Sequence, residues 1–351
     1  MEAKEALDKI IRKSRVHFYK PIQIAEILHR HRTVGSFGVN RLERYRNASK
    51  KWRDEVSLRL IGSVSTSSQK FQDNLFEENA MPPRHIAELA KINEETNGIV
   101  EAYIYQSLRK RLSSVFNVKN YIEQSSAETF SLNELVSFFV RQPGLKRSVD
   151  KIYEITVYAL FAAIVRALEV YVTLEVRNRD EAILKDFERF ISTVLGVDAG
   201  HTRIDMQAEL YRMGVANAAD TGLDMFANFG AAVQVKHLTL TPEVIEDIAE
   251  GLPADRIVVV CKDAEKDAID TLLKQVGWGS RIQGIITLSD LDAWYALCLS
   301  EKYRQKLGKF LLDDLEGEFK LEFPSTVNIE PFLRDRGYDI IQLAGDWEVA
   351  A

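Results

Sequence analysis

Three polar side chains lie in or just before a short apolar stretch of the sequence, residues 231–238 (AAVQVKHL). Gln234 and Lys236 interrupt this stretch one residue apart, and Asp224 precedes Gln234 by ten positions. If residues 228–230 form the turn of a β-hairpin, Asp224 lies opposite Gln234, and directly opposed residues have Cβ atoms about 5 Å apart. Alternate residues of a strand share a face, so Lys236 projects from the same face as Gln234. The spacing therefore predicts that a carboxylate, an amide and an ammonium converge on one patch of a β-sheet.

This combination of groups suits the hydrolysis of a phosphodiester bond. The reaction needs a general base or a metal ion to activate water at neutral pH, and positive charge to stabilise the phosphate. Mg²⁺ prefers oxygen ligands and keeps several waters. We therefore expect Asp224 and the side-chain oxygen of Gln234 to bind Mg²⁺, with the Val235 carbonyl as a further ligand. Lys236 is expected to orient the water or to stabilise the developing charge.

A simpler interpretation of the same residues is a salt bridge. Asp224 and Lys236 would neutralise each other at the edge of a sheet, and Gln234 would form hydrogen bonds with both. An acid followed after nine residues by Gln, any residue and Lys is a weak pattern. Spacing alone leaves this alternative open.

The surrounding sequence resembles a known nuclease signature. In the PD-(D/E)xK nucleases an acid opens one strand, and an acid-x-Lys motif lies on the next. The segment NAADTGLDMFANFGAAVQVKHLTL, residues 217–240, is similar to the corresponding segment of type II restriction endonucleases of the HaeII kind. The stretches KSRVHFYKPIQIAEIL and VSLRLIGSVSTSSQK also resemble that family, so the similarity is expected to cover most of the chain.

This resemblance implies a Mg²⁺-dependent enzyme that cuts both strands of DNA at a short palindromic site as a homodimer. It also implies 5′-phosphate and 3′-hydroxyl ends and, by analogy only, a purine-GCGC-pyrimidine target. Two residues depart from the general signature: Leu223 replaces a proline, and Gln234 replaces the usual acid. The second change removes one negative charge. It should weaken metal binding, and it puts a two-metal mechanism in doubt.

Glu154 is a further candidate metal ligand. It interrupts the apolar segment KIYEITVYALF within a helix predicted over residues 149–170, and a buried carboxylate without a partner is costly. In the fold of the related nucleases, the helix before the sheet often contributes a glutamate to the metal. The alternative is that Glu154 lies in the exposed first turn of the helix and pairs with Lys151.

The elements that would position these residues indicate an α/β (α+β mixed) protein. Helical spacing of apolar residues dominates the N-terminal part, and Pro143-Gly144 marks a boundary. Apolar strands at 256–261 and 282–288 alternate with predicted helices at 241–252 and 265–278, which favours a mixed sheet. We therefore predict three regions: a mainly helical DNA-recognition region (1–145), a PD-(D/E)xK core with a central mixed sheet flanked by helices (146–300), and a C-terminal extension packed on that core (301–351).

Charge is distributed unevenly along the chain. Residues 1–70 contain 16 Lys and Arg against 7 Asp and Glu, a net charge of +9, so the remaining 281 residues must carry −15 of the total of −6. A basic end on an acidic body suggests a surface for a polyanion, although a solvated basic face is the alternative. Basic side chains of this region would contact phosphates, and some would reach bases in the major groove. The predicted DNA-binding residues are Arg41, Arg44, Arg46, Lys50, Lys51, Arg53, Gln69 and Lys70.

Composition excludes several other classes of protein. The 351 residues are 46% hydrophobic and 28% charged, which is ordinary for a globular protein. No apolar signal segment opens the chain, and the longest candidate for a membrane span, Ile155–Val165, has only 11 residues. The two cysteines, Cys261 and Cys298, lack metal-ligand spacing and are interpreted as structural thiols of a cytoplasmic protein.

Three functions remain compatible with the sequence. The first is the sequence-specific endonuclease that the resemblance implies. The second is a DNA-binding protein that keeps the fold but has lost the chemistry, which the amide of Gln234 favours. The third is a repair nuclease that recognises the shape of DNA instead of its sequence.

Overall fold

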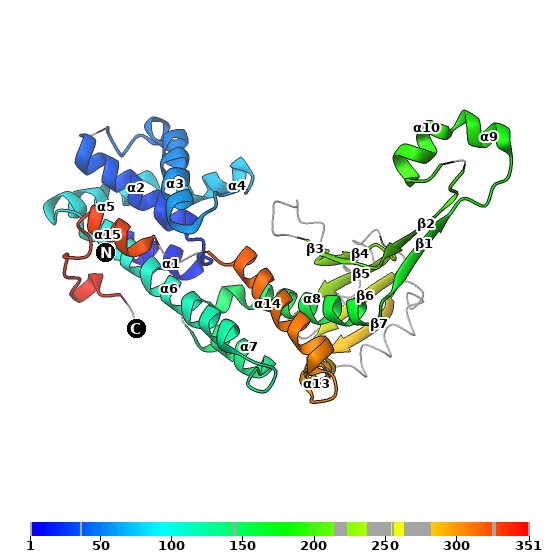
Figure 1. The fold of residues 1–351 in the computed structure, drawn as a ribbon. Coiled ribbons are helices and arrows are strands. Elements are labelled where there is room, and N and C mark those ends of the chain that lie inside the picture. Colours follow the sequence, from blue (N-terminus) through cyan, green and yellow to red (C-terminus); the bar gives the residue numbers. More distant parts are fainter. Residues whose placement is uncertain are drawn as a thin grey trace, which may run out of the picture. The chain divides into compact units, whose positions relative to one another are not determined.

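The computed structural model describes residues 2–35, 37–142, 145–198, 200–213, 223–236, 254, 256–262, 282–324 and 328–349. These residues form two compact units (Figure 1). The first unit comprises the described residues before 154 and after 315, and the second comprises those in between. No helix in these parts of the chain is both long and apolar enough to cross a lipid bilayer.

The first unit is helical, as predicted for the N-terminal region. Most of its helices bury apolar side chains, and two of the described ones begin at a serine whose side chain caps the helix. The first helix buries Leu7, Ile10 and Ile11 on a single face, and the Ser131 side chain caps a later helix by accepting a hydrogen bond from the Glu134 N–H. The helices are α1 (Glu2–Lys13), α2 (Tyr19–Val34), α3 (Arg46–Ile61), α4 (Gln69–Asp73), α5 (Pro83–Glu95), α6 (Ile99–Gln124), α7 (Leu132–Arg141) and α15 (Ile329–Asp335).

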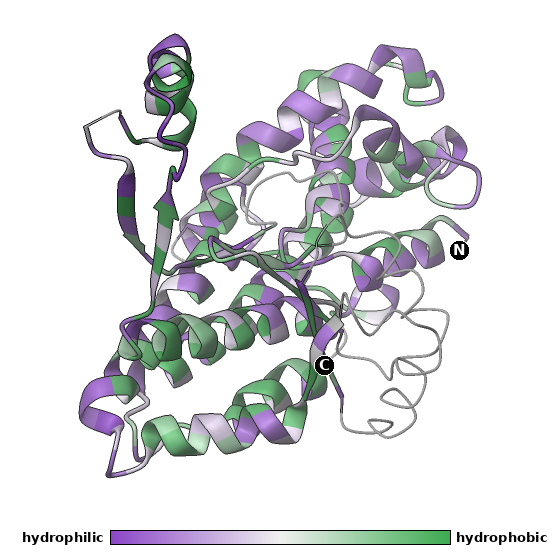
Figure 2. Ribbon diagram, turned by 90° about the vertical axis from the view of Figure 1, so that its right-hand side faces the viewer, coloured by the Kyte–Doolittle hydropathy of each residue, from purple (hydrophilic) through white to green (hydrophobic). Residues whose placement is uncertain are grey.

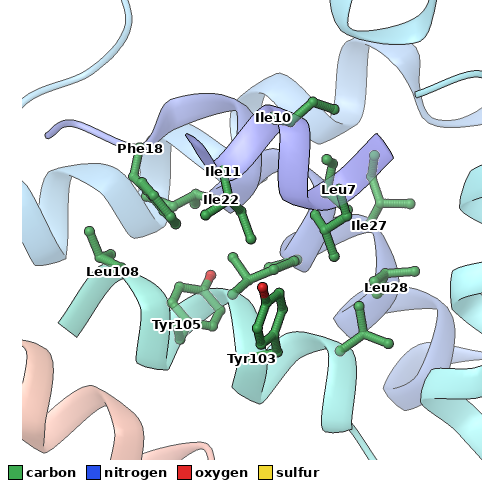
Figure 3. Packing of buried hydrophobic residues seen from close by; sticks show 14 of the residues in the cluster. Leu7, Ile10, Ile11, Phe18, Ile22, Ile27, Leu28, Tyr103, Tyr105 and Leu108 are labelled. Atoms are coloured by element: carbon green, nitrogen blue, oxygen red, sulfur yellow. The ribbon is translucent and has the colours of Figure 1, made fainter. Parts of the chain in front are cut away.

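Residues from both ends of the chain share the hydrophobic core of this unit. Leu7, Ile22 and Tyr105 from α1, α2 and α6 are fully buried in it (Figure 3). Phe332 and Leu333 of α15 belong to the same core. Burying each such side chain contributes about 1.5–3 kcal/mol, so removal of the C-terminal segment would open a large gap in this core.

A buried carboxylate joins four segments of the same unit. Glu101 in α6 is fully buried and accepts hydrogen bonds from Arg32 Nε at 2.9 Å and Asn93 Nδ2 at 2.6 Å. His29 Nδ1 lies 2.9 Å from Glu101 Oε2, and the Tyr338 hydroxyl donates to the same oxygen. Burial alone would raise the pKa of Glu101, but these hydrogen bonds outweigh burial and lower the pKa to about 2.

The second unit contains the mixed sheet that the sequence predicts. The strand order is β3-β4-β5-β6-β7, with antiparallel pairing from β3 to β5 and parallel pairing from β5 to β7. Parallel neighbours require a crossover connection, and the two helices predicted for this purpose, 241–252 and 265–278, lie outside the described residues. The strands are β3 (Leu210–Arg212), β4 (Met225–Ala227), β5 (Ala231–Val235), β6 (Arg256–Cys261) and β7 (Ile282–Thr287).

Helix α8 (Val149–Ala167) covers one side of this sheet. Its Phe161 and Val165 side chains pack against Leu210, Ala227 and Ala231, which are aligned across β3, β4 and β5. The predicted long apolar helix is therefore confirmed, and its apolar stripe faces the sheet. Two further helices of this part of the chain are α13 (Leu288–Leu299) and α14 (Lys309–Glu322).

A two-stranded ribbon in this unit was not predicted. Strands β1 (Tyr171–Glu175) and β2 (Arg203–Gln207) pair antiparallel and form a sheet of their own. They carry a helical tip, which consists of α9 (Glu181–Asp186), α10 (Glu188–Phe190) and a π-helical turn at Ile191–Leu195 (Figure 1). The segment YVTLE contains Tyr171 and the β-branched Val172 and Thr173, residue types enriched in strands, which is the signal that the sequence offers for β1.

Candidate functional site

The predicted hairpin and its register are confirmed. Met225 pairs with Val233 and Phe226 with Ala232, so the next step along the two strands sets Asp224 opposite Gln234. Gly230 closes the turn with a φ of 91°, a conformation that glycine adopts without steric cost.

Asp224 and Gln234 are in direct contact. The Gln234 side-chain nitrogen donates a hydrogen bond of 2.6 Å to Asp224 Oδ2, and the Val235 backbone N–H donates one of 2.7 Å to the same oxygen. On the other side, the Asp224 carbonyl accepts a hydrogen bond of 2.7 Å from the Met213 N–H. Both the side chain and the backbone of Asp224 are therefore fixed by neighbouring strands.

This contact gives the Gln234 amide a defined orientation. Its nitrogen is used as a donor, so its oxygen, Oε1, points away from the Asp224 oxygen that accepts the bond. Gln234 is only 3% exposed, and Oε1 has no hydrogen-bond partner among the described residues. A buried acceptor without a donor costs about 1–3 kcal/mol, and a bound cation would remove that cost.

Lys236 follows the last residue of β5. Its backbone N–H donates to the Val260 carbonyl at 2.8 Å and so extends the pairing with β6. Its side chain is half-buried. Among the contacts of the described residues, no ion pair joins the Lys236 ammonium to the Asp224 carboxylate. The structure therefore does not form the salt bridge that spacing left open.

Glu154 lies in the second turn of α8 and is only 5% exposed. The alternative of an exposed glutamate in the first turn is therefore wrong. Its carboxylate Oε2 lies 3.7 Å from Arg212 Nη1 in β3, and the Arg212 side chain is only 1% exposed. Arg212 is not among the predicted site residues. The sequence leaves residues 206–215 open between a strand and a short helix; as a strand, they put Arg212 on the same face as the apolar Leu210, where a buried partner for an acid is expected.

The two polar pairs project from different sides of the sheet. Arg212 pairs with Met225 and Met225 with Val233, so these three residues share the side that α8 covers. Glu154 meets Arg212 on that side. Gln234 is the neighbour of Val233 along β5 and therefore projects from the opposite side. The sharing of one metal ion by Glu154 and Gln234 stays a prediction.

The side-chain oxygen atoms at the hairpin are of the type that binds magnesium. The Asp224 carboxylate and the buried Gln234 Oε1 are oxygen ligands, and one unsatisfied oxygen already lies beside the acid. Within the described parts of the chain, no group of three His, Cys, Asp or Glu side chains could hold a metal ion. A cation here would therefore depend on an amide oxygen, backbone carbonyls and water in addition to Asp224.

The predicted DNA-binding residues differ in how accessible they are. Arg53 is buried, with its guanidinium 2.7 Å from Asp54 and 3.2 Å from the Gln23 side-chain oxygen. Lys50 is largely covered and lies 2.6 Å from Asp73. The other six side chains are exposed around α3 and α4: Arg41, Arg44, Arg46, Lys51, Gln69 and Lys70.

Comparison with known proteins covers nearly the whole chain. A family model described as HaeII restriction endonuclease matches residues 3–338. The type II restriction enzyme HaeII of Haemophilus aegyptius is 46% identical over 339 residues, which is 96% of each chain. The type II restriction enzyme NgoBI of Neisseria gonorrhoeae is 46% identical over 342 residues, 97% of each chain. No solved structure matches this chain.

Proposed function

The chain belongs to the HaeII restriction endonuclease family, and on this premise we propose that it hydrolyses both strands of DNA at a short palindromic site, as a homodimer and with Mg²⁺. Its activity is that of a type II restriction enzyme, a site-specific deoxyribonuclease. The products we propose are 5′-phosphate and 3′-hydroxyl ends. By family analogy the proposed target is purine-GCGC-pyrimidine.

One observation carries the assignment of the site. The Asp224–Gln234 hydrogen bond leaves a buried amide oxygen without a partner among the described residues, next to a carboxylate. We propose that Asp224 and Gln234 Oε1 hold Mg²⁺, and that the Val235 carbonyl contributes a further oxygen. When bound, the ion would activate a water molecule and offset the negative charge of the phosphate.

The other residues of the proposed site act on the water and the phosphate. Lys236, two residues beyond Gln234, orients the attacking water and stabilises the charge that develops on the phosphate. The Asp224 carboxylate is held in place by the Val235 N–H, so it does not have to reorganise during the reaction. Glu154 is kept as a proposed ligand; because it meets Arg212 on the other side of the sheet, it would have to exchange the Arg212 guanidinium for the cation and change its orientation to join the shell.

The charge of the site favours one divalent ion. Asp224 contributes one negative charge and Lys236 one positive charge, while Glu154 and Arg212 offset each other on the other side of the sheet, so these four groups sum to zero. A second divalent cation would face strong repulsion, because Gln234 supplies no charge to offset it. We therefore propose a one-metal site.

Target binding is proposed for the exposed basic side chains of the first unit. Arg41, Arg44, Arg46, Lys51 and Lys70 would contact phosphates or bases, with Gln69 available to a base edge. Arg53 and Lys50 are left out of this set because their charged groups are occupied by carboxylates within the unit.

The cytoplasm is the proposed location, because that is where a restriction enzyme meets incoming DNA. Cys261 and Cys298 are both buried and neither forms a disulfide, which suits a reducing compartment.

Digestion of a genome of known sequence in the presence of Mg²⁺ tests these proposals. Fragment ends that share one short palindrome support the restriction enzyme. Ends without a common sequence would indicate a nuclease that recognises DNA shape.

The second candidate function is a DNA-binding protein without catalysis, and the amide of Gln234 is the observation that favours it. Such a protein would retard DNA in a gel and leave every molecule intact, whatever divalent ion is added.

A further inference from the structure

The helical tip of the β1–β2 ribbon carries an uncovered apolar surface. Four of its residues are large, hydrophobic and exposed: Ile183 at 44%, Phe187 at 58%, Phe190 at 55% and Val194 at 62%. They lie four, three and four residues apart along the tip: Ile183 in α9, Phe187 at the turn that follows it, Phe190 in α10 and Val194 in the π-helical turn. We call these four residues the tip stripe, and Figure 2 shows hydrophobic and hydrophilic positions alternating along this tip.

The ribbon itself does not account for the tip stripe. A two-stranded ribbon needs a third strand or a packed helix to be stable by itself, and β1 and β2 pair only with each other among the described strands. Both strands alternate exposed and half-exposed residues, so neither face of the ribbon is fully buried. An exposed apolar patch at the end of such a ribbon is typical of a site that binds another molecule.

DNA is a poor match for this surface. Residues 169–207 contain eight Asp and Glu against five Lys and Arg, a net charge of −3. A phosphate backbone would be repelled by this charge, and an apolar stripe offers it no donor. Arg203, the basic residue at the start of β2, is already paired with Asp205 at 3.1 Å. The partner is therefore a protein with an apolar surface.

The size of the tip stripe is compatible with pairing to a second copy of itself. With side-chain areas of about 150–250 Å², the exposed fractions leave roughly 400 Å² of apolar surface on each copy. Two copies would bury roughly 800 Å². Since homodimer interfaces are about 65% apolar, this corresponds to a total of about 1,200 Å², the lower end of the range for stable interfaces.

We propose that the tip stripe is a dimerisation surface that binds the tip stripe of a second copy across a twofold axis. This rests on the proposed function in one respect, because a twofold dimer presents one catalytic site to each strand of a palindromic target. A twofold interface brings the same patch of both copies together, so an apolar stripe is complementary to itself. Phe187 and Phe190, the two aromatic residues of the stripe, are its anchors.

The oligomeric state of the full-length protein tests this inference. The Phe187→Ser/Phe190→Ser variant should raise the dimer dissociation constant by about 100-fold or more in sedimentation equilibrium. Ile340→Ser, which changes an 80% exposed side chain in the first unit, is the matched control and should leave the constant unchanged. Circular dichroism and thermal unfolding establish that each variant is folded. A folded double variant that dimerises as well as the wild type, or a wild type that is monomeric, overturns the proposal.

Cross-linking provides a second measurement if the double variant does not fold. Both natural cysteines are buried, so only the introduced thiol should react. Val194→Cys, in the tip stripe, should be joined to its counterpart by a short bismaleimide in high yield, whereas Ile340→Cys, outside the stripe, should not. Equal yields for the two variants overturn the proposal.

Digestion of DNA by the wild type distinguishes failure of the proposed dimerisation surface from failure of the proposed function. A wild type that cuts at a palindrome but does not dimerise through the tip stripe contradicts only the dimerisation surface. If the wild type dimerises and the Phe187→Ser/Phe190→Ser variant does not, but the wild type never cuts DNA, only the proposed function is contradicted.

Discussion

The Asp224 carboxylate and the Gln234 amide are joined by a hydrogen bond of 2.6 Å between the two arms of the β4–β5 hairpin. The bond uses the nitrogen of the amide and so leaves its oxygen as the available acceptor. A glutamate at the same position would repel Asp224 unless a cation lay between them. The amide thus gives the chain a site that is held together without metal, in exchange for weaker electrostatic attraction of the metal.

Substitution of this amide by an acid should therefore strengthen metal binding. Gln234→Glu is expected to tighten Mg²⁺ binding by about tenfold or more, because it adds a full negative charge to the proposed ligand set. Without metal, the same variant should be less stable than the wild type, since two carboxylates would face each other. Calorimetric titration with Mg²⁺ and urea unfolding with and without Mg²⁺ measure both effects. An unchanged Mg²⁺ affinity would remove position 234 from the metal site.

Loss of Lys236 should remove catalysis and spare binding. Lys236→Ala is expected to lower the rate of single-turnover cleavage by about 10²–10⁴-fold, because the water and the phosphate lose their cation. Stability should change little, since the side chain is half-buried and makes no ion pair with Asp224 within the described structure. Gel retardation in Ca²⁺ should give an affinity within a few-fold of the wild type. A variant that still cuts at nearly the wild-type rate would assign Lys236 a structural role.

Asp224 should control the response to metal. Asp224→Ala removes the acceptor of two hydrogen bonds and the carboxylate that contacts Gln234. Cleavage should be lost, and Mg²⁺ titration should show no binding at concentrations that saturate the wild type. Asp205→Ala, a change on the exposed β1–β2 ribbon, is a suitable control for metal binding. A Mg²⁺ response that survives in Asp224→Ala would exclude this residue from the metal shell.

The Glu154–Arg212 pair allows metal binding to be separated from folding. Glu154→Gln should destabilise the protein by about 3–5 kcal/mol, because it leaves the Arg212 guanidinium buried beside a neutral partner. If Glu154 also binds the ion, as proposed, the variant should require more Mg²⁺ for cleavage. The double variant Glu154→Met/Arg212→Met should recover much of the stability and none of the lost Mg²⁺ affinity. Lower stability with unchanged Mg²⁺ affinity would assign Glu154 to the ion pair alone.

The hairpin of the candidate site could be predicted because all of its determinants are local. Gly230 provides the positive φ of the turn, and the residues on either side alternate with the period of a strand, so the register follows from counting. The apolar runs of β6 and β7 are equally visible.

Features that depend on distant residues could not be predicted in the same way. Strands β1 and β2 are separated by residues 176–202, and nothing in the segment YVTLE indicates which later segment pairs with it. Arg53 looks like its exposed neighbours in the sequence, but Gln23, on another helix, accepts one of its hydrogen bonds. Sequence patterns indicate which residues can bind DNA, whereas only tertiary packing decides which of them remain free to do so.

The contrast between Lys51 and Arg53 tests that distinction. Lys51 is exposed, so Lys51→Ala should weaken binding to all DNA sequences and reduce the slope of log affinity against log salt by about 1. Arg53→Ala should instead lower the stability of the protein by about 1–3 kcal/mol, because it leaves buried hydrogen-bonding groups without their partner. Fluorescence anisotropy at several salt concentrations and urea unfolding measure the two effects. Equal loss of salt dependence in both variants would contradict the burial of Arg53.

Acid should destabilise the helical unit through Glu101. The pKa of Glu101 is lowered to about 2 in the folded protein, because the hydrogen bonds from its four partners outweigh the burial that would raise it. A depressed carboxyl pKa stabilises the fold above the unfolded pKa of about 4.3, and the stabilisation is lost as the pH falls from there towards 2. A difference of this size corresponds to about 3 kcal/mol.

Urea unfolding of the wild type at about pH 7 and about pH 3 should therefore show a clear loss of stability. Glu101→Gln cannot ionise, so this variant should be less stable at neutral pH and should lose much less stability on acidification. Glu95→Gln changes an exposed glutamate in the same unit and should keep the wild-type pH dependence. A Glu101→Gln variant with the full wild-type pH dependence would show that acid acts through other carboxylates, and that the Arg32–Glu101–Tyr338 network does not depend on the charge of Glu101.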